Sequence, residues 1–134
     1  MSLRSLPLIV LAFILYNVVV LLFGIDALDK NLFEIPMLSG GLWKFNWGHL
    51  IILATLMLLF VELVKSTYTN ASSLVDHGLS MIVFIACLIE FLMTPQAATS
   101  VFFLIVVATA IDVVAGFTIG IRVAQRDLTF GTSN

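Results

Sequence analysis

Residues 101–121 read VFFLIVVATAIDVVAGFTIGI, an apolar run with a single acid, Asp112, near its centre. A helix of about 20 apolar residues is long enough to cross the hydrocarbon core of a bilayer. A charged side chain at that depth costs ~2.5–3.5 kcal/mol on insertion scales, so such residues usually face protein or a water-filled cavity. The sequence therefore predicts a transmembrane helix in which Asp112 faces another helix instead of lipid.

Small residues share the helix face of this acid, because residues four positions apart lie on the same side of a helix. They are Ala108, Gly116 and Gly120, and the two glycines form a GxxxG pair that permits close approach of two backbones. We expect this face to be a helix contact. Thr109 and, in the first apolar segment, Asn17 are the polar residues expected to support that packing.

The composition places the whole chain among membrane proteins. Of its 134 residues, 61% are hydrophobic and 10% are charged, whereas soluble domains carry about 25% charged residues. A soluble fold of this size could not bury so much apolar surface. The few basic residues are scattered, which argues against a nucleic-acid partner. The prediction is an all-α fold, a four-helix transmembrane bundle formed by a single domain, residues 1–134.

Four apolar segments define the expected spans: about residues 7–25, 47–64, 76–93 and 99–121. Asn46 is expected to cap the second helix, and Pro95 to end the third. The loop 26–46 carries apolar residues at near-helical spacing, which predicts a short helix lying on the membrane surface. Trp43 and Trp47 are expected to anchor this end at the interface.

Basic residues set the expected orientation, because they favour the cytoplasmic side of a membrane. Four of the six basic residues fall on one side of a four-span chain: Arg4, Lys65, Arg122 and Arg126. Both termini are therefore predicted to face the cytoplasm, an N-in, C-in topology.

Two acids inside the predicted spans, Asp112 and Glu90, are the candidate functional residues. In one interpretation they bind a proton or a cation. In the other, each only fixes packing, with Asp112 held by Thr109, Asn17 or a partner helix. The two acids are expected about two helical turns apart in depth, too far for a tight carboxylate pair, although a relay bridged by water remains open.

The other polar residues indicate neither a cofactor nor catalysis. Glu62 and Lys65, three residues apart at the inner end of the second span, are interpreted as an interfacial ion pair. His49 and His77 are expected at opposite membrane faces, so they cannot ligate one haem. No three metal-binding side chains share a depth and a face, and no nucleophile triad or phosphate-binding loop is present. We expect no metal, no cofactor and no enzyme activity.

Three stretches carry a family resemblance: Ser39-Gly40-Gly41, Val75-Asp76-His77 and, most strongly, Ile111-Asp112-Val113-Val114-Ala115-Gly116-Phe117. Between residues 39 and 127 the chain resembles an uncharacterised family of small four-span inner-membrane proteins of the alphaproteobacterial type. The resemblance implies four spans in a bacterial inner membrane. It implies no activity.

Two function classes remain open. In the first, the chain is a non-catalytic structural or accessory subunit, or a self-associating membrane protein, whose partners are the lipid bilayer and a homo-oligomer or larger membrane complex. In the second, it is a small oligomeric proton- or cation-coupled transporter or channel that uses Asp112 and Glu90. This second class needs an oligomer, because one chain of four helices is narrow for a solute pathway.

Overall fold

The computed structural model describes the backbone of residues 7–68 and 74–132. Most of these residues lie in four α-helices: α1 (Val10–Phe23), α2 (Trp47–Tyr68), α3 (Leu74–Met93) and α4 (Ser100–Thr132). Between α1 and α2 come a 3₁₀ helix, η2 (Ile25–Asp29), and two strands, β1 (Asn31–Pro36) and β2 (Leu42–Asn46). A second 3₁₀ helix, η3 (Pro95–Ala97), joins α3 to α4.

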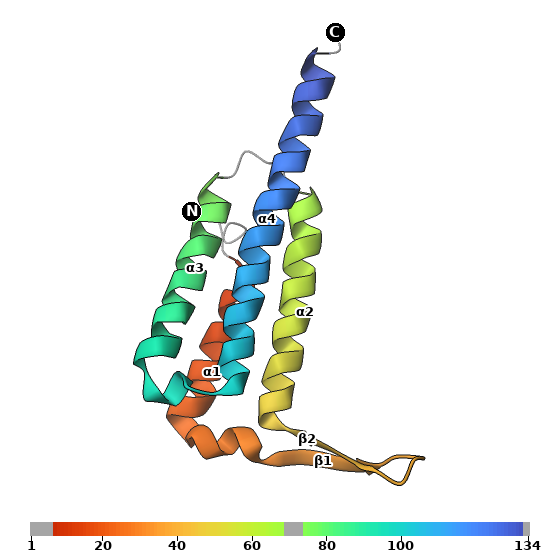
Figure 1. Cartoon of the computed structure of the whole chain (residues 1–134), viewed down its shortest axis with the longest axis vertical. Coiled ribbons are helices and arrows are strands. Elements are labelled where there is room, and N and C mark those ends of the chain that lie inside the picture. Colours follow the sequence, from red (N-terminus) through yellow and green to blue (C-terminus); the bar gives the residue numbers. More distant parts are fainter. Residues whose placement is uncertain (1–6, 69–73, 133–134) are drawn as a thin grey trace.

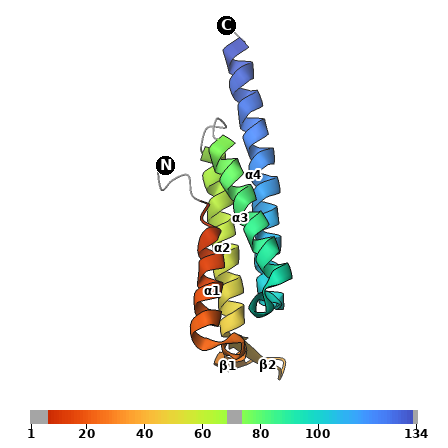
Figure 2. The ribbon, with the colours of Figure 1, turned by 90° about the vertical axis from the view of Figure 1, so that its left-hand side faces the viewer.

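The helices run alternately toward and away from the β-hairpin, as Figures 1 and 2 show. We call the end that carries β1 and β2 the hairpin end, and the opposite end the far end. Helix α4 lies between α2 and α3 and makes its most extensive contacts with these two, whereas α1 packs mainly on α2. Helices α2 and α3 follow one another in the sequence, but α4 separates them in space (Figure 1).

The local signals in the sequence explain where the helices begin and end. Asn46 caps α2, because its Oδ1 accepts a hydrogen bond of 2.8 Å from the backbone N–H of His49. Helix α3 ends at Met93, two residues before Pro95, as expected for a residue that cannot continue a helix. Helix α4 has 33 residues and runs beyond the other helices at the far end (Figures 1 and 2).

Two segments of the described chain are both long and apolar enough to cross a membrane: Trp47–Thr67 in α2 and Ser100–Ile119 in α4. The apolar parts of α1 and α3, Val10–Phe23 and His77–Met93, are shorter. The prediction of four helices is confirmed. Four membrane spans stay a prediction.

The short surface helix predicted for the loop 26–46 is present only as the 3₁₀ helix η2 at the start of the loop, and residues 31–46 instead form an antiparallel hairpin of β1 and β2. Its strands hold three aromatic residues and the β-branched Ile35, residue types that favour a pleated, half-buried surface. Gly40 adopts φ +91° in the turn, a conformation that costs glycine little. The fold is therefore mostly helical with a small two-stranded sheet, and not purely α.

The core at the hairpin end is built around the fully buried Phe102 of α4. The ring of Tyr16 meets it edge-on at a centroid distance of 4.9 Å, and Ile51 and Cys87 belong to the same buried cluster. Gly48 permits this close packing, because a Cβ there would lie 3.0 Å from the Val101 side chain. No pattern in the sequence predicted this role for Gly48.

The small-residue face of α4 is a helix contact, as predicted. Ala108 and Gly116 are buried, and a Cβ at Gly116 would lie 3.6 Å from Nδ1 of His77 on α3. The surroundings of Gly120 lie outside the described residues. The face therefore packs against helices of the same chain.

Replacing Gly116 with leucine should lower the free energy of unfolding by about 1–3 kcal/mol, because the larger side chain must displace the His77 ring. The measurement is thermal or denaturant unfolding in detergent. Val114→Leu is the matched control, since Val114 is 66% exposed two residues away on the same helix. Equal losses for the two variants would show that Gly116 is not at a close contact.

Candidate functional site

Polar side chains from three helices meet in the half of the molecule toward the far end. Asp112 of α4 is only 3% exposed, and the hydroxyl of Ser80 on α3 hydrogen-bonds to its carboxyl group. The charges of Glu62 and Lys65, both on α2, lie close enough to act on that carboxyl group. These four residues are called the acid cluster below. The predicted burial of Asp112 against other helices is confirmed.

One oxygen of Asp112 is unsatisfied. Its Oδ2 is buried and has no hydrogen-bond partner among the described residues. A buried oxygen of this kind costs free energy unless a proton, an ion or a water molecule meets it. The acid cluster therefore places a buried carboxyl oxygen, without a partner in the described chain, near the charges of Glu62 and Lys65.

Glu62 is buried near the far end of α2, and its predicted ion pair with Lys65 stays a prediction. It is 8% exposed, and its Oε2 accepts a hydrogen bond of 2.9 Å from the backbone N–H of Leu8. Leu8 lies in the turn that leads into α1, where backbone N–H groups have no partner within the helix. A carboxylate is also favoured there by the helix dipole. Glu62 thus ties the start of α1 to α2.

The two residues expected to hold Asp112 have other partners. The side-chain amide of Asn17 donates to the carbonyl of Phe13, and the hydroxyl of Thr109 donates to the carbonyl of Val106, each within its own helix. Ser80 was not predicted, because a serine in an apolar helix is too common to carry a signal by itself. The short connection between α3 and α4 makes them antiparallel neighbours, and a comparison of depths along the two helices would have pointed to Ser80.

Glu90 belongs to a separate polar group at the hairpin end. Its charge acts on Tyr16 and on Cys87, and its buried Oε2 has no hydrogen-bond partner within the described chain. The hydroxyl of Tyr16 donates to the backbone carbonyl of Gln96 at 2.7 Å and lies 2.7 Å from Oγ1 of Thr99. This hydroxyl links α1 to the connection between α3 and α4.

The two candidate acids do not form one site. Ser80, which bonds to Asp112, precedes Glu90 by ten residues on α3, a separation of ~15 Å along the helix. This agrees with the expectation that Asp112 and Glu90 are too far apart for a tight carboxylate pair. The structure gives each acid its own set of neighbours.

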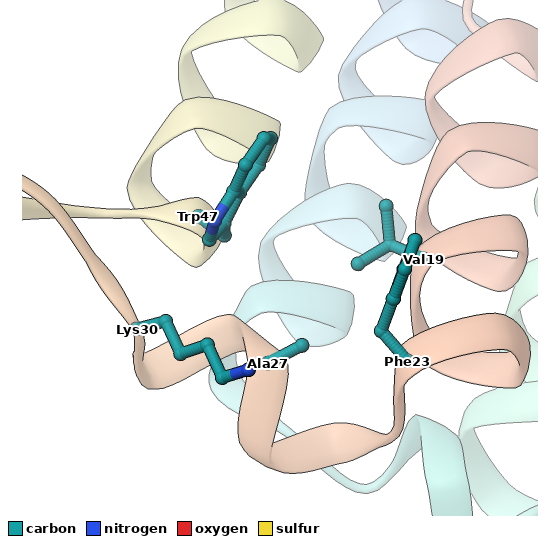
Figure 3. A pocket seen from close by; sticks show the side chains of 5 residues that line it. All are labelled: Val19, Phe23, Ala27, Lys30 and Trp47. Atoms are coloured by element: carbon teal, nitrogen blue, oxygen red, sulfur yellow. The ribbon is translucent and has the colours of Figure 1, made fainter.

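An apolar pocket of about 280 Å³ lies at the hairpin end, between α1, η2 and the first turn of α2. Figure 3 shows Val19 and Phe23 on one side, Trp47 on the other, and the side chain of Lys30 beside Ala27. The combination of apolar walls and one amino group suits an apolar chain with an anionic end. No feature of the sequence predicted this pocket.

The histidines lie at opposite ends of the helices, where the sequence placed them. His49 is near the hairpin, and its Nδ1 accepts a hydrogen bond from the backbone N–H of Asn46. His77 stacks on Phe117 with a ring-centroid distance of 4.7 Å. Within residues 7–67 and 77–119, no three His, Cys, Asp or Glu side chains lie close enough together to hold a metal ion.

A comparison of the chain with protein-family models, curated proteins and solved structures finds no match. The resemblance to small four-span inner-membrane proteins therefore stays a prediction, and the site is interpreted from its own geometry.

Replacing Glu62 with leucine should lower the free energy of unfolding by about 1–3 kcal/mol, because the N–H of Leu8 would be left without an acceptor. Glu62→Gln keeps an acceptor oxygen at the same place and should lose less. Both variants are measured by unfolding in detergent at low and high salt. Small, equal and salt-sensitive losses would instead indicate that Glu62 contributes mainly through an ion pair.

Proposed function

We propose that this chain is an integral membrane protein, a four-helix bundle whose helices all cross the bilayer, and that it serves as a non-catalytic structural or accessory subunit. One observation carries the membrane assignment: large apolar side chains cover the outward surface of every helix. The most exposed of them are Leu21, Leu22 and Phe23 on α1, Met57 and Phe60 on α2, Leu92 and Met93 on α3, and Val114 on α4. Soluble monomers rarely expose contiguous apolar patches of this size.

The helix lengths are compatible with four crossings. Helices α2 and α3, with 22 and 20 residues, are ~33 and ~30 Å long, close to the ~30 Å hydrocarbon core. Helix α1 has 14 residues, or ~21 Å, and the turn over residues 7–9 extends it. Local thinning of the bilayer accommodates such a short span at modest cost. The bacterial inner membrane is the location that the family resemblance favours.

The accessory role is supported by how the internal polar groups are used. Glu62 on α2 accepts a hydrogen bond from the segment that leads into α1, and Ser80 on α3 hydrogen-bonds to Asp112 on α4. Tyr16 on α1 donates a hydrogen bond to the connection between α3 and α4. These bonds hold the helices together. A second copy or a larger membrane complex would contact the apolar outer surface, because helices of the same chain already cover Ala108 and Gly116 on α4.

The predicted topology places the hairpin outside and both termini in the cytoplasm. The test uses a Cys87→Ala parent with one new cysteine, Leu38→Cys at the fully exposed hairpin turn or Asn134→Cys. Spheroplasts are treated with a maleimide that cannot cross membranes. Leu38→Cys should react at once and Asn134→Cys only after permeabilisation, while the parent stays unlabelled.

The opposite pattern of labelling would reverse the orientation. Labelling of both cysteines in intact spheroplasts would mean an even number of crossings between residues 38 and 134. That result would rule out crossing by all three of α2, α3 and α4, and with it the four-span proposal.

Proton or cation binding at the acid cluster is the second candidate function. It is favoured by the buried Oδ2 of Asp112, which lacks a hydrogen-bond partner in the described chain and lies near the charges of Glu62 and Lys65. Glu90 has a similar unpartnered oxygen at the hairpin end. Because ~15 Å separates these groups along α3, transport by this route needs water or a second copy between them.

Asp112→Asn separates the two functions, because asparagine is nearly isosteric and can bond to Ser80 but cannot titrate. An accessory role predicts that this variant unfolds within about 1 kcal/mol of the parent, and that Asp112→Leu loses more because Ser80 is left unpaired. Proton flux in vesicles reconstituted with the parent and with Asp112→Asn should then be equally low. A flux that the parent supports and Asp112→Asn abolishes, with folding intact, would establish proton handling instead.

A further inference from the structure

The β1–β2 hairpin has one aromatic face and one face with an acid and a base. Phe33 pairs with Phe45 and Ile35 pairs with Trp43, so these four side chains share a face. The three aromatic rings form one cluster, with the rings of Phe33 and Phe45 stacked at 4.9 Å. On the other face, Glu34 lies opposite Lys44, and Pro36 lies opposite Leu42.

The aromatic face is turned toward the outer surface of α2. Trp43 and Phe45 line a groove of about 300 Å³ together with Ile52, Leu53 and Leu56 of that helix. The ring of Phe45 also lies 5.7 Å from that of His49, in the first turn of α2. Figure 1 shows the hairpin extending sideways from the end of α2, across the direction of the helices. The face with Glu34 and Lys44 points away from them.

An aromatic face of this kind is stable only when other groups shield it from water. A two-stranded hairpin is marginally stable by itself in water, and here Phe33, Ile35 and Trp43 are each 40–47% exposed. The exposed side of α2, including Leu53 and Leu56, continues into the aromatic face through the groove. Whatever covers that side of α2 therefore also reaches the hairpin.

The depth of the hairpin follows from its backbone. Each strand has a free edge whose N–H and C=O groups cannot be satisfied in hydrocarbon. Tryptophan, in contrast, is favoured at the level of the lipid headgroups, where its ring has both apolar and polar neighbours. These two requirements meet at the boundary between headgroups and acyl chains.

We infer that the hairpin lies flat on the bilayer with its aromatic face in this boundary and its Glu34–Lys44 face in water. Phospholipid then fills the corner between the hairpin and α2, with acyl chains along Leu53 and Leu56 and the glycerol region near Trp43. This inference rests on the proposed membrane insertion of the helices. It assigns the hairpin the role of a stop that sets how deeply α2 sits in the bilayer.

Tryptophan fluorescence can test the two faces separately, because the chain has only two tryptophans. One protein carries Trp47→Phe and keeps Trp43. Its matched control carries Trp43→Phe, Trp47→Phe and Lys44→Trp, which moves the reporter by one residue to the opposite face. Both are placed in phosphatidylcholine nanodiscs whose lipids carry a nitroxide on the headgroup, near the glycerol or near the chain end.

Nitroxides on the headgroup and near the glycerol should quench Trp43 severalfold more than the tryptophan of Lys44→Trp. Acrylamide in the water should show the reverse order. Equal access of acrylamide to both positions would overturn the inference. Shielding of both positions from acrylamide and from lipid would overturn it too, and would indicate a second protein chain on the hairpin.

A third protein separates this inference from the membrane proposal. It carries Val114→Trp with both native tryptophans replaced by phenylalanine, and Val114 lies on the outer surface of α4. Strong quenching of this reporter by the nitroxide near the chain end, without lipid quenching of Trp43, would leave the membrane proposal intact and refute the hairpin inference. Absence of quenching at both positions would refute both.

Discussion

The placement of α4 between α2 and α3 is the constraint on which the rest of the structure depends. Ala108 and Gly116 are small residues on one face of α4, so neighbouring helices can pack closely against that face. The same face carries Asp112, so close packing and the burial of an acid are consequences of one surface. Because α4 occupies the space between them, α2 and α3 contribute Glu62, Lys65 and Ser80 from opposite sides of this acid.

Polar groups are arranged in two layers that fix the relative positions of the helices. Toward the far end, Glu62 connects α2 to the start of α1, and Ser80 connects α3 to α4. Toward the hairpin end, Tyr16 connects α1 to the segment between α3 and α4. The buried cluster around Phe102 and Ile105 is apolar, and apolar packing specifies the relative positions of the helices less sharply than hydrogen bonds do. Hydrogen bonds between helices supply that specificity, because a shift of one turn would leave each polar group unpaired.

The sequence predicted the elements better than the contacts between them. Apolar runs, the Asn46 cap and Pro95 were sufficient to locate the helices, because these signals are local. The partner of Asp112 required matching depths along α3 and α4, and hydropathy alone does not reveal that α4 also lies against α2. The bond between Glu62 and Leu8 was not predictable for a similar reason, since the two residues are 54 positions apart in the sequence. In the loop 26–46, the apolar spacing fits a helix until the pairing of Phe33 with Phe45 is considered.

The two ends of the molecule are chemically different, and in the proposed membrane setting this difference would hold the polar layers at constant depth. The hairpin end presents Trp43 and Trp47, which favour the interface, whereas the far end presents Lys65 and Arg122, which favour the headgroups and water. A helix assembly anchored at both ends cannot slide along the membrane normal to bring Asp112 to water. The energetic cost of the buried acid is therefore reduced inside the protein, by the hydrogen bond from Ser80 and the positive charge of Lys65, and not by movement of the whole molecule. The negative charge of Glu62 acts in the opposite direction.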